Sequence, residues 1–155
     1  MTTTAVLVFI SANDCVHCTN FIKNELGKLE ARVANIKKVE FVHIHLESRF
    51  LKVGAEYHPQ LTSYIGWYPT FLLFTYSSWH SRNELYGVIL NGIKMGNAIH
   101  QVNSSQFTEV TTDNIINWVN RNIEHNSIFS NNMNPIYVNQ ATSNNNNFVL
   151  KTVYN

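Results

Sequence analysis

The sequence predicts an α/β fold, because strand-like and helix-like patterns alternate along it. Three apolar runs rich in Val, Ile, Leu and Phe have the length and composition of strands, at residues 5–11, 39–46 and 69–76. A helical pattern separates the first two runs, and this order implies a parallel pair of strands with a right-handed crossover. A chain of 155 residues is expected to form one domain with a full core.

The first predicted strand, residues 5–11, ends at the turn residues Asn13 and Asp14. From Cys15 onward, apolar residues recur at spacings of three and four, as on the buried face of an amphipathic helix: Ile22, Leu26, Leu29, Val33 and Ile36. The pattern therefore predicts that Cys15 and Cys18 open a helix directly after a buried strand.

The second predicted strand, residues 39–46, alternates between two faces. One face carries Val42, Ile44 and Leu46, and the other carries Phe41, His43 and His45. We expect a short helix within residues 56–66, ended by Gly66, before the third strand. Pro69 opens that strand, at a position where no backbone N–H is needed for the sheet.

Residues 77–111 carry weaker signals. The segments 86–90 and 98–102 resemble strands, and the turn residues Asn-Gly and Gly-Asn lie between them, which predicts a hairpin. Trp79 and His80 are expected in a surface loop, since no periodic pattern includes them.

The C-terminal part begins with a predicted helix that Thr112 or Asp113 caps. Its buried stripe comprises Ile115, Ile116, Val119 and Ile123. Beyond Asn126 the composition shifts to Asn and Ser, so we expect an Asn-rich tail over residues 127–155. Apolar residues within this tail, Phe129 among them, are candidates for docking on the core or on a partner.

Composition and charge exclude several classes of protein. Charged residues make up only 14% of the chain and the net charge is +1. The chain therefore lacks the excess of positive charge that attracts nucleic acid or an anionic membrane. The N-terminus lacks the features of a signal peptide, and its apolar run is too short to span a bilayer. We therefore expect a cytoplasmic protein that binds neither nucleic acid nor membrane. A virion or another assembly is the other location considered.

The two cysteines point to redox chemistry. At the start of a helix, free amide N–H groups and the positive helix end stabilise a thiolate on the first cysteine. Cys15 is therefore the candidate nucleophile, and Cys18, one helical turn later, is the candidate resolving thiol that attacks a mixed disulfide. His17 lies between them, where it favours the thiolate form of Cys15.

The segment VLVFISANDCVHC resembles the active-site strand and loop of the thioredoxin superfamily, and WYPTFLLF resembles that family's second landmark. The resemblance spans residues 4–125 and implies a thioredoxin-like domain over residues 1–126, with a central mixed β-sheet flanked by helices and an insertion at 77–111. It also implies a cis-proline at Pro69 that faces the cysteine pair. The residue before it, Tyr68, would contact the substrate backbone, and Trp67 completes the substrate-binding candidates.

Two positions depart from the family pattern. Asp14 stands where the family has Trp, and its negative charge opposes thiolate formation on Cys15, although its carboxylate is also able to cap the helix. Phe9 stands where the family has a buried acid that moves protons off the second cysteine. His43 and His45 are the candidates we consider for that proton transfer.

These features predict a thiol–disulfide oxidoreductase that acts on protein cysteines and needs no cofactor. Its expected partners are proteins with disulfides or thiols and a recycling reductase or oxidant. The alternative is a redox-inactive or regulatory thioredoxin-fold interaction module in a larger assembly, such as a viral or structural one. We expect no metal site, because zinc sites of the Cys2His2 type place their histidines on a helix, whereas His43 and His45 alternate along a strand. The sequence leaves the oligomeric state and the direction of electron flow open.

Overall fold

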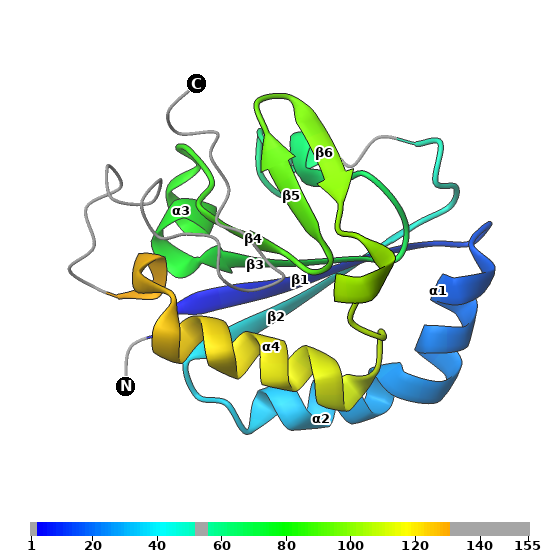
Figure 1. Ribbon diagram of the computed structural model, residues 1–155, viewed down its shortest axis with the longest axis horizontal. Helices are drawn as coiled ribbons and strands as arrows, with labels where there is room; N and C mark the ends of the chain where they lie inside the picture. Colours follow the sequence, from blue (N-terminus) through cyan, green and yellow to red (C-terminus); the bar gives the residue numbers. More distant parts are fainter. Residues whose placement is uncertain (1–2, 52–55, 131–155) are drawn as a thin grey trace.

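A mixed, open β-sheet of six strands forms the centre of the computed structural model, which describes residues 3–51 and 56–130 (Figure 1). The strand order is β2-β1-β3-β4-β5-β6. The strands are β1 (Ala5–Ala12), β2 (Val39–Leu46), β3 (Thr70–Thr75), β4 (Gly87–Ile89), β5 (Gly92–Met95) and β6 (Ala98–Gln101). β1 pairs with β2 in parallel, as the sequence predicts, and the remaining pairs are antiparallel.

Helices cover both faces of this sheet (Figure 1). On one face, α1 (Val16–Phe21), a π-helical segment (Ile22–Leu26) and α2 (Gly27–Ala34) follow one another, and α4 (Thr112–His125) lies beside α2. The other face is covered by a 3-10 helix (Leu61–Tyr64) and by α3 (Tyr76–Ser81). Two further 3-10 helices span Ser104–Gln106 and Ser127–Phe129.

The alternation of side chains along β1 divides the core into two layers. All eight residues of β1 are buried, and Ala5, Leu7 and Phe9 pack toward α2 and α4. Val6, Val8 and Ile10 pack against the opposite layer. The apolar stripe predicted for the first helix lies in the former layer, and the two predicted faces of β2 divide between the layers as expected.

The segment after β3 differs from the sequence prediction, because a helix replaces the expected surface loop. Thr75 caps α3, with its hydroxyl accepting a hydrogen bond from the Ser78 amide at 3.3 Å. Trp79 is buried against Phe74, with ring centroids 5.8 Å apart. His80 pairs with Glu40 on β2 at 3.1 Å. A helix of six residues is too short to show a periodic pattern, which is why the sequence did not reveal it.

The predicted hairpin is instead a meander of three strands, since β5 lies between the two segments that resemble strands. Asn91 and Gly96, both with positive φ, sit in the turns on either side of β5. Lys94 obscured this strand in the sequence because a lysine usually marks an exposed surface. Here the Lys94 side chain is buried, with its amine donating to the Gly96 carbonyl at 2.5 Å and lying 5.1 Å from the centre of the Tyr64 ring.

Thr111 caps α4, one residue before the two predicted candidates, and its hydroxyl accepts from the Asn114 amide at 3.2 Å. Thr112, one of the predicted caps, has another role: its amide donates to the Glu25 carboxylate at 2.8 Å and so joins α4 to the π-helical segment. Beyond α4, Ile128 and Phe129 are buried in the same core layer. The rest of the predicted tail, from residue 131, lies outside the described residues. Within the described part, no helix has the length and apolar character needed to cross a membrane.

Candidate functional site

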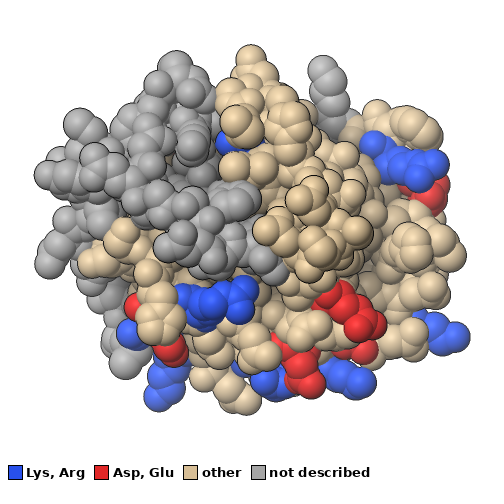
Figure 2. Space-filling view, viewed as in Figure 1, with Lys and Arg blue, Asp and Glu red and all other residues tan. Residues whose placement is uncertain are grey.

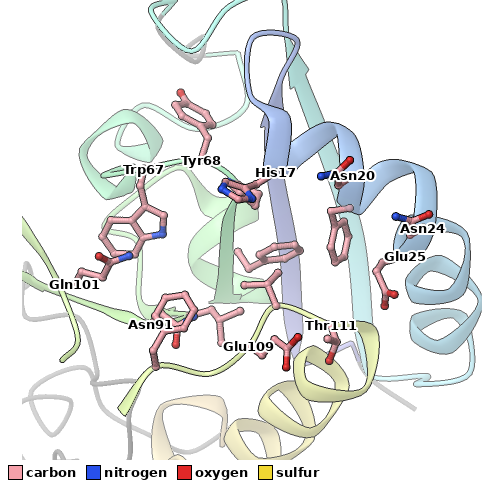
Figure 3. Close-up of a pocket in the computed structure, with 16 residues that line it drawn as sticks. His17, Asn20, Asn24, Glu25, Trp67, Tyr68, Asn91, Gln101, Glu109 and Thr111 are labelled. Atoms are coloured by element: carbon pink, nitrogen blue, oxygen red, sulfur yellow. The ribbon is translucent and has the colours of Figure 1, made fainter. Parts of the chain in front are cut away.

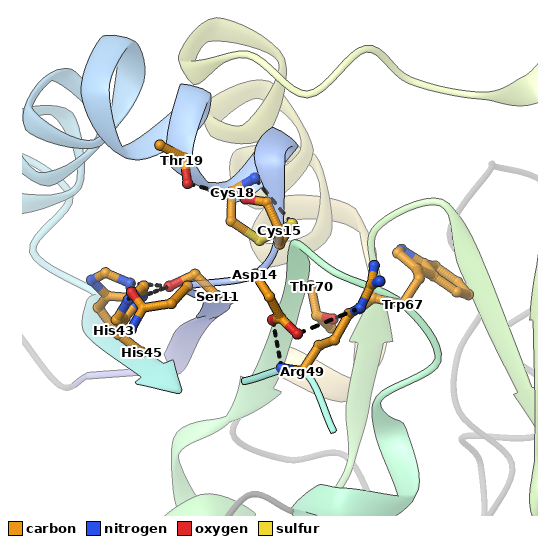
Figure 4. Close-up of a disulfide and its surroundings, with 11 residues drawn as sticks. Ser11, Asp14, Cys15, Cys18, Thr19, His43, His45, Arg49, Trp67 and Thr70 are labelled. Carbon is orange, nitrogen blue, oxygen red and sulfur yellow. Dashed lines mark hydrogen bonds and ion pairs between the residues drawn. A yellow bond between two sulfur atoms is a disulfide. The ribbon is translucent and has the colours of Figure 1, made fainter. Parts of the chain in front are cut away.

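Cys15 and Cys18 form a disulfide where β1 ends and α1 begins (Figure 4), with Cα atoms 5.2 Å apart. Cys15 is the N-cap residue of α1, and its Sγ accepts a hydrogen bond from the Cys18 backbone amide at 3.1 Å. Thr19 adds two hydrogen bonds to the Cys15 carbonyl, from its amide at 3.0 Å and from its hydroxyl at 3.1 Å. The first turn of the helix therefore holds both cysteines in place.

The two cysteines differ in exposure. Cys18 is fully buried, whereas Cys15 is 6% exposed and lines a surface hollow together with Phe50, Leu51 and Tyr68. Phe50 and Leu51 are themselves largely exposed, at 81% and 51%. A reagent that enters this hollow meets Cys15 first.

Asp14 does not cap the helix, contrary to one expectation from the sequence. Its carboxylate accepts hydrogen bonds from the Arg49 backbone amide at 2.7 Å and from the Ser48 hydroxyl at 3.0 Å, and it also lies 3.7 Å from the Arg49 side chain. The hydrogen bond from the Arg49 amide is the main cause that lowers the pKa of Asp14. Asp14 thus stays charged beside Cys15 and ties the segment before Phe50 to the cysteine loop (Figure 4).

Phe9, where the resemblance would place a buried acid, is an aromatic core residue. It is fully buried and stacks between Phe71, at 4.7 Å, and His43, at 4.5 Å, with Phe21 against its edge at 5.1 Å. Because a phenyl ring exchanges no protons, any proton transfer at Cys18 requires another group.

A chain of hydrogen bonds runs from His43 through Ser11 and His45 to Asn13, and Figure 4 shows Ser11 with the two histidines. The parallel register places Ser11 beside His45, and the buried Ser11 hydroxyl lies 2.7 Å from His45 Nδ1 and 2.8 Å from His43 Nε2. Asn13 Nδ2 donates to Glu47 at 3.3 Å, so its Oδ1 accepts from His45 Nε2 at 2.6 Å. With His45 neutral, its Nδ1 then accepts from Ser11, and Ser11 accepts from His43. Burial lowers the pKa of His43, and the neighbouring His45 lowers it further.

Trp67 and Tyr68 line the hollow of Cys15, and Pro69 follows them in the chain. The Tyr68–Pro69 peptide bond is cis, as the resemblance implies. Tyr68 packs against the buried cluster of Ala12, Cys15 and Cys18, and burial followed by the charge of Asp14 raises the pKa of its hydroxyl. Thr70 donates a hydrogen bond to the Trp67 carbonyl, which holds the Trp67–Pro69 segment at the start of β3.

A pocket of about 570 Å³ lies beside this segment, and His17, Trp67, Tyr68 and Pro69 all line it (Figure 3). The structure therefore brings Tyr68 against the disulfide and places the exposed His17 on the rim of a neighbouring cavity. Sequence reasoning missed other residues that shape the two cavities, Phe50 and Glu109 among them. Their places depend on long-range contacts such as the one between Asp14 and Arg49, which no local pattern reveals.

In residues 3–51 and 56–130, no three or more His, Cys, Asp and Glu side chains gather in a way that would hold a metal ion. Comparisons of the chain with protein-family models, with curated proteins and with solved structures find no significant match. The geometry of the site is therefore the basis for assigning a function.

Proposed function

We propose that this protein is a thiol–disulfide oxidoreductase with a thioredoxin-like fold, acting on protein cysteines through Cys15 and Cys18. The observation that carries the proposal is the disulfide at the start of a helix, in which the Cys18 amide donates to Cys15 Sγ. In the reduced protein, this amide and the positive helix end favour the thiolate of Cys15 over its thiol. The thiolate is the form that attacks disulfides.

The two cysteines have different roles because their exposure differs. In the reducing direction, the Cys15 thiolate attacks one sulfur of a substrate disulfide, forms a mixed disulfide and releases the other substrate sulfur as a thiolate. The Cys18 thiolate then attacks Cys15 Sγ, which forms the Cys15–Cys18 disulfide and releases the second substrate thiolate. Two electrons pass from the protein to the substrate. The oxidising direction reverses these steps, and a recycling reductase or oxidant restores the starting form.

The surroundings of the pair support the remaining roles. His17 tunes the Cys15 thiolate from its place between the cysteines, and Tyr68, Pro69 and Trp67 shape the groove in which the substrate lies. The open sheet, with a parallel β1–β2 pair and antiparallel neighbours, agrees with the central mixed β-sheet that the resemblance implies. The layer of helices formed by α1, α2 and α4 agrees with it as well.

A trapping experiment tests this function. The Cys18→Ser variant, incubated with a disulfide-linked peptide dimer, is expected to stop at the mixed disulfide because the resolving sulfur is absent. Mass spectrometry under non-reducing conditions would show one peptide attached through Cys15. The Cys15→Ser variant is the matched control and is expected to trap no peptide, since Cys18 is buried. Failure of the Cys18→Ser variant to trap peptide, together with failure of the wild type to reduce it, would contradict the proposal.

A redox-inactive interaction module is the second candidate. Two observations favour it: Phe9 supplies no acid for proton transfer, and Asp14 places a negative charge beside Cys15. In that case the cysteine pair would exchange with no peptide disulfide, and Cys15→Ser would leave partner binding intact.

A further inference from the structure

The pocket beside the cysteine pair has the size of a ligand site. It lies between α1, the Trp67–Pro69 segment and the chain that leads into α4 (Figure 3), and its volume of about 570 Å³ falls within the roughly 300–1,000 Å³ usual for such sites. Part of its lining is apolar and includes Phe21, Phe71 and Leu90. A long side chain with an apolar stem therefore fits this space.

The pocket adjoins the hollow in which Cys15 lies. Trp67 and Tyr68 line both cavities, so the two are neighbours on either side of these residues. His17, from the turn of helix that carries the cysteines, also lines the pocket. If substrates join to Cys15 as the proposed function requires, the residues that flank the substrate cysteine come within reach of this neighbouring pocket.

The charged groups in the pocket are mainly acidic. Among the described residues that line it, Glu25 and Glu109 are the carboxylates, His17 is the one other titratable group besides Tyr68, and neither Lys nor Arg is present. Figure 3 shows both glutamates toward the end of the pocket away from Tyr68, and Figure 2 shows acidic side chains over the region where the chain leads into α4.

The two carboxylates have different surroundings. The hydrogen bond from the Thr112 amide holds the pKa of Glu25 below its usual value. Lys28 lies 4.0 Å from Glu25, but the lysine side chain is 70% exposed, so solvent screens its charge. Glu109 is exposed, and its backbone carbonyl accepts the hydrogen bonds from Thr111 and Asn114. These hydrogen bonds use the backbone of Glu109, while the residue is exposed and lines the pocket.

We propose that this pocket binds a basic side chain, Lys or Arg, of a protein segment whose cysteine exchanges disulfides with Cys15. The methylene stem lies along the apolar lining and the charged end reaches Glu109 and Glu25, an arrangement that suits the amphipathic form of both side chains. Acidic segments are excluded by the same two carboxylates. The position of the segment rests on the proposed function, whereas the charge preference rests on the pocket itself.

Binding of peptides that cannot react tests the inference separately from the redox chemistry. Fluorescence anisotropy would compare labelled peptides with a central Ser in place of Cys, flanked on both sides by Lys, Gln or Glu. The wild type is expected to bind the Lys peptide about tenfold more tightly than the Glu peptide, with the difference shrinking as salt is added. Glu109→Lys should remove or reverse this order. Glu124→Lys makes the same charge change at the exposed end of α4 and should preserve it.

The outcomes separate the two proposals. Equal binding of all three peptides by the wild type, or an unchanged order in Glu109→Lys, would overturn the inference whether or not cysteine-containing peptides are reduced. A charge preference without any disulfide exchange would support the pocket assignment and contradict the redox function. Peptide reduction at rates that follow the order Lys, Gln, Glu would support both.

Discussion

Asp14 accepts a hydrogen bond from the backbone amide of Arg49 at 2.7 Å, across 35 positions of the sequence. The contact joins the residue before Cys15 to the segment that carries the exposed Phe50 and Leu51. One carboxylate, on the residue before Cys15, therefore anchors the segment that lines the hollow of Cys15.

Replacing Asp14 by Asn is expected to lower the pKa of Cys15 in the reduced protein, by up to about one unit, because a like charge beside the thiolate is removed. The amide oxygen of Asn still accepts from Arg49, so the loop keeps its place. Titrating the thiolate absorbance of the reduced variant against pH measures the shift. Asp113→Asn removes a carboxylate from the start of α4 and should leave the pKa of Cys15 unchanged. A Cys15 pKa that stays the same or rises in Asp14→Asn would show that the charge of Asp14 does not act on the sulfur.

Ser11 is expected to matter for stability because its buried hydroxyl serves two histidines at once. Ser11→Ala leaves His43 Nε2 and His45 Nδ1 without this partner and should lower the free energy of unfolding by about 1–3 kcal/mol. Urea denaturation followed by circular dichroism measures the loss. Ser105→Ala, at an exposed position of a 3-10 helix, should change stability by no more than about 0.5 kcal/mol. Equal stability of the two variants would mean that the Ser11 hydroxyl contributes nothing to the fold.

His58 makes the protein less stable in acid. It is buried against Trp79, its Nδ1 accepts from the Gln60 amide at 3.1 Å, and its Nε2 donates to the Ser78 carbonyl at 3.1 Å. A proton on Nδ1 would oppose the Gln60 N–H, and burial is the main cause that lowers the pKa of His58 in the folded chain. In the unfolded chain the pKa returns to about 6.5.

The sign of the pH effect follows from this difference. Between the folded and unfolded pKa values of His58, the unfolded chain binds more protons than the folded chain. The contribution of neutral His58 to the free energy of unfolding is therefore fully present above about pH 6.5 and is lost as the pH falls through the folded pKa. His43, whose pKa is also lowered, acts in the same direction. Urea midpoints measured from pH 8 to pH 5 should therefore decrease. His58→Asn should be less stable at pH 8 yet lose less on acidification, and a loss as steep as that of the wild type would contradict the role of His58.

Gly92 leaves space for the Trp67 indole, which lines both cavities. A Cβ at position 92 would overlap the Trp67 ring and lie 3.2 Å from the His100 carbonyl oxygen. Gly92→Ala should displace the indole, alter its near-ultraviolet circular dichroism and lower stability by about 1–3 kcal/mol. Gly27→Ala is the matched control: nothing lies within 4 Å of the added Cβ, and alanine in a helix should stabilise by about 0.5–1 kcal/mol. An unchanged Trp67 signal in Gly92→Ala would show that the glycine does not position the ring.

The elements that the sequence predicts well are those whose pattern is local and regular. β1 and β2 are runs of eight residues, all buried in β1 and mostly half-buried in β2, and the helix after Cys15 shows its apolar stripe over five positions. Their order along the chain is enough to predict a parallel pair with the cysteines at the head of the crossover. The disulfide between Cys15 and Cys18 follows from that placement.

Other features depend on contacts that no local pattern contains. A lysine normally indicates an exposed position, and only the contact of the Lys94 amine with the Tyr64 ring shows otherwise here. The helix α3 is too short to show a helical period in the sequence. The hydrogen bonds of Ser11 with His43 and His45 become predictable only once the register of β1 and β2 is known. The acidic character of the pocket beside Trp67 depends likewise on bringing Glu25 and Glu109 into one lining from different parts of the chain.

The reduction potential of the cysteine pair tests the central claim most directly. The purified protein would be equilibrated in glutathione or dithiol buffers that cover a range of redox potentials and then quenched with an alkylating agent. Mass spectrometry would count the alkylated, and therefore free, thiols. We predict one reversible two-electron transition in which both thiols appear together, and no such transition in Cys15→Ser. A value near about −270 mV would indicate a reductant and one near about −180 mV an oxidant or isomerase. The absence of a reversible transition at every poise would contradict the claim that Cys15 and Cys18 exchange electrons with a substrate.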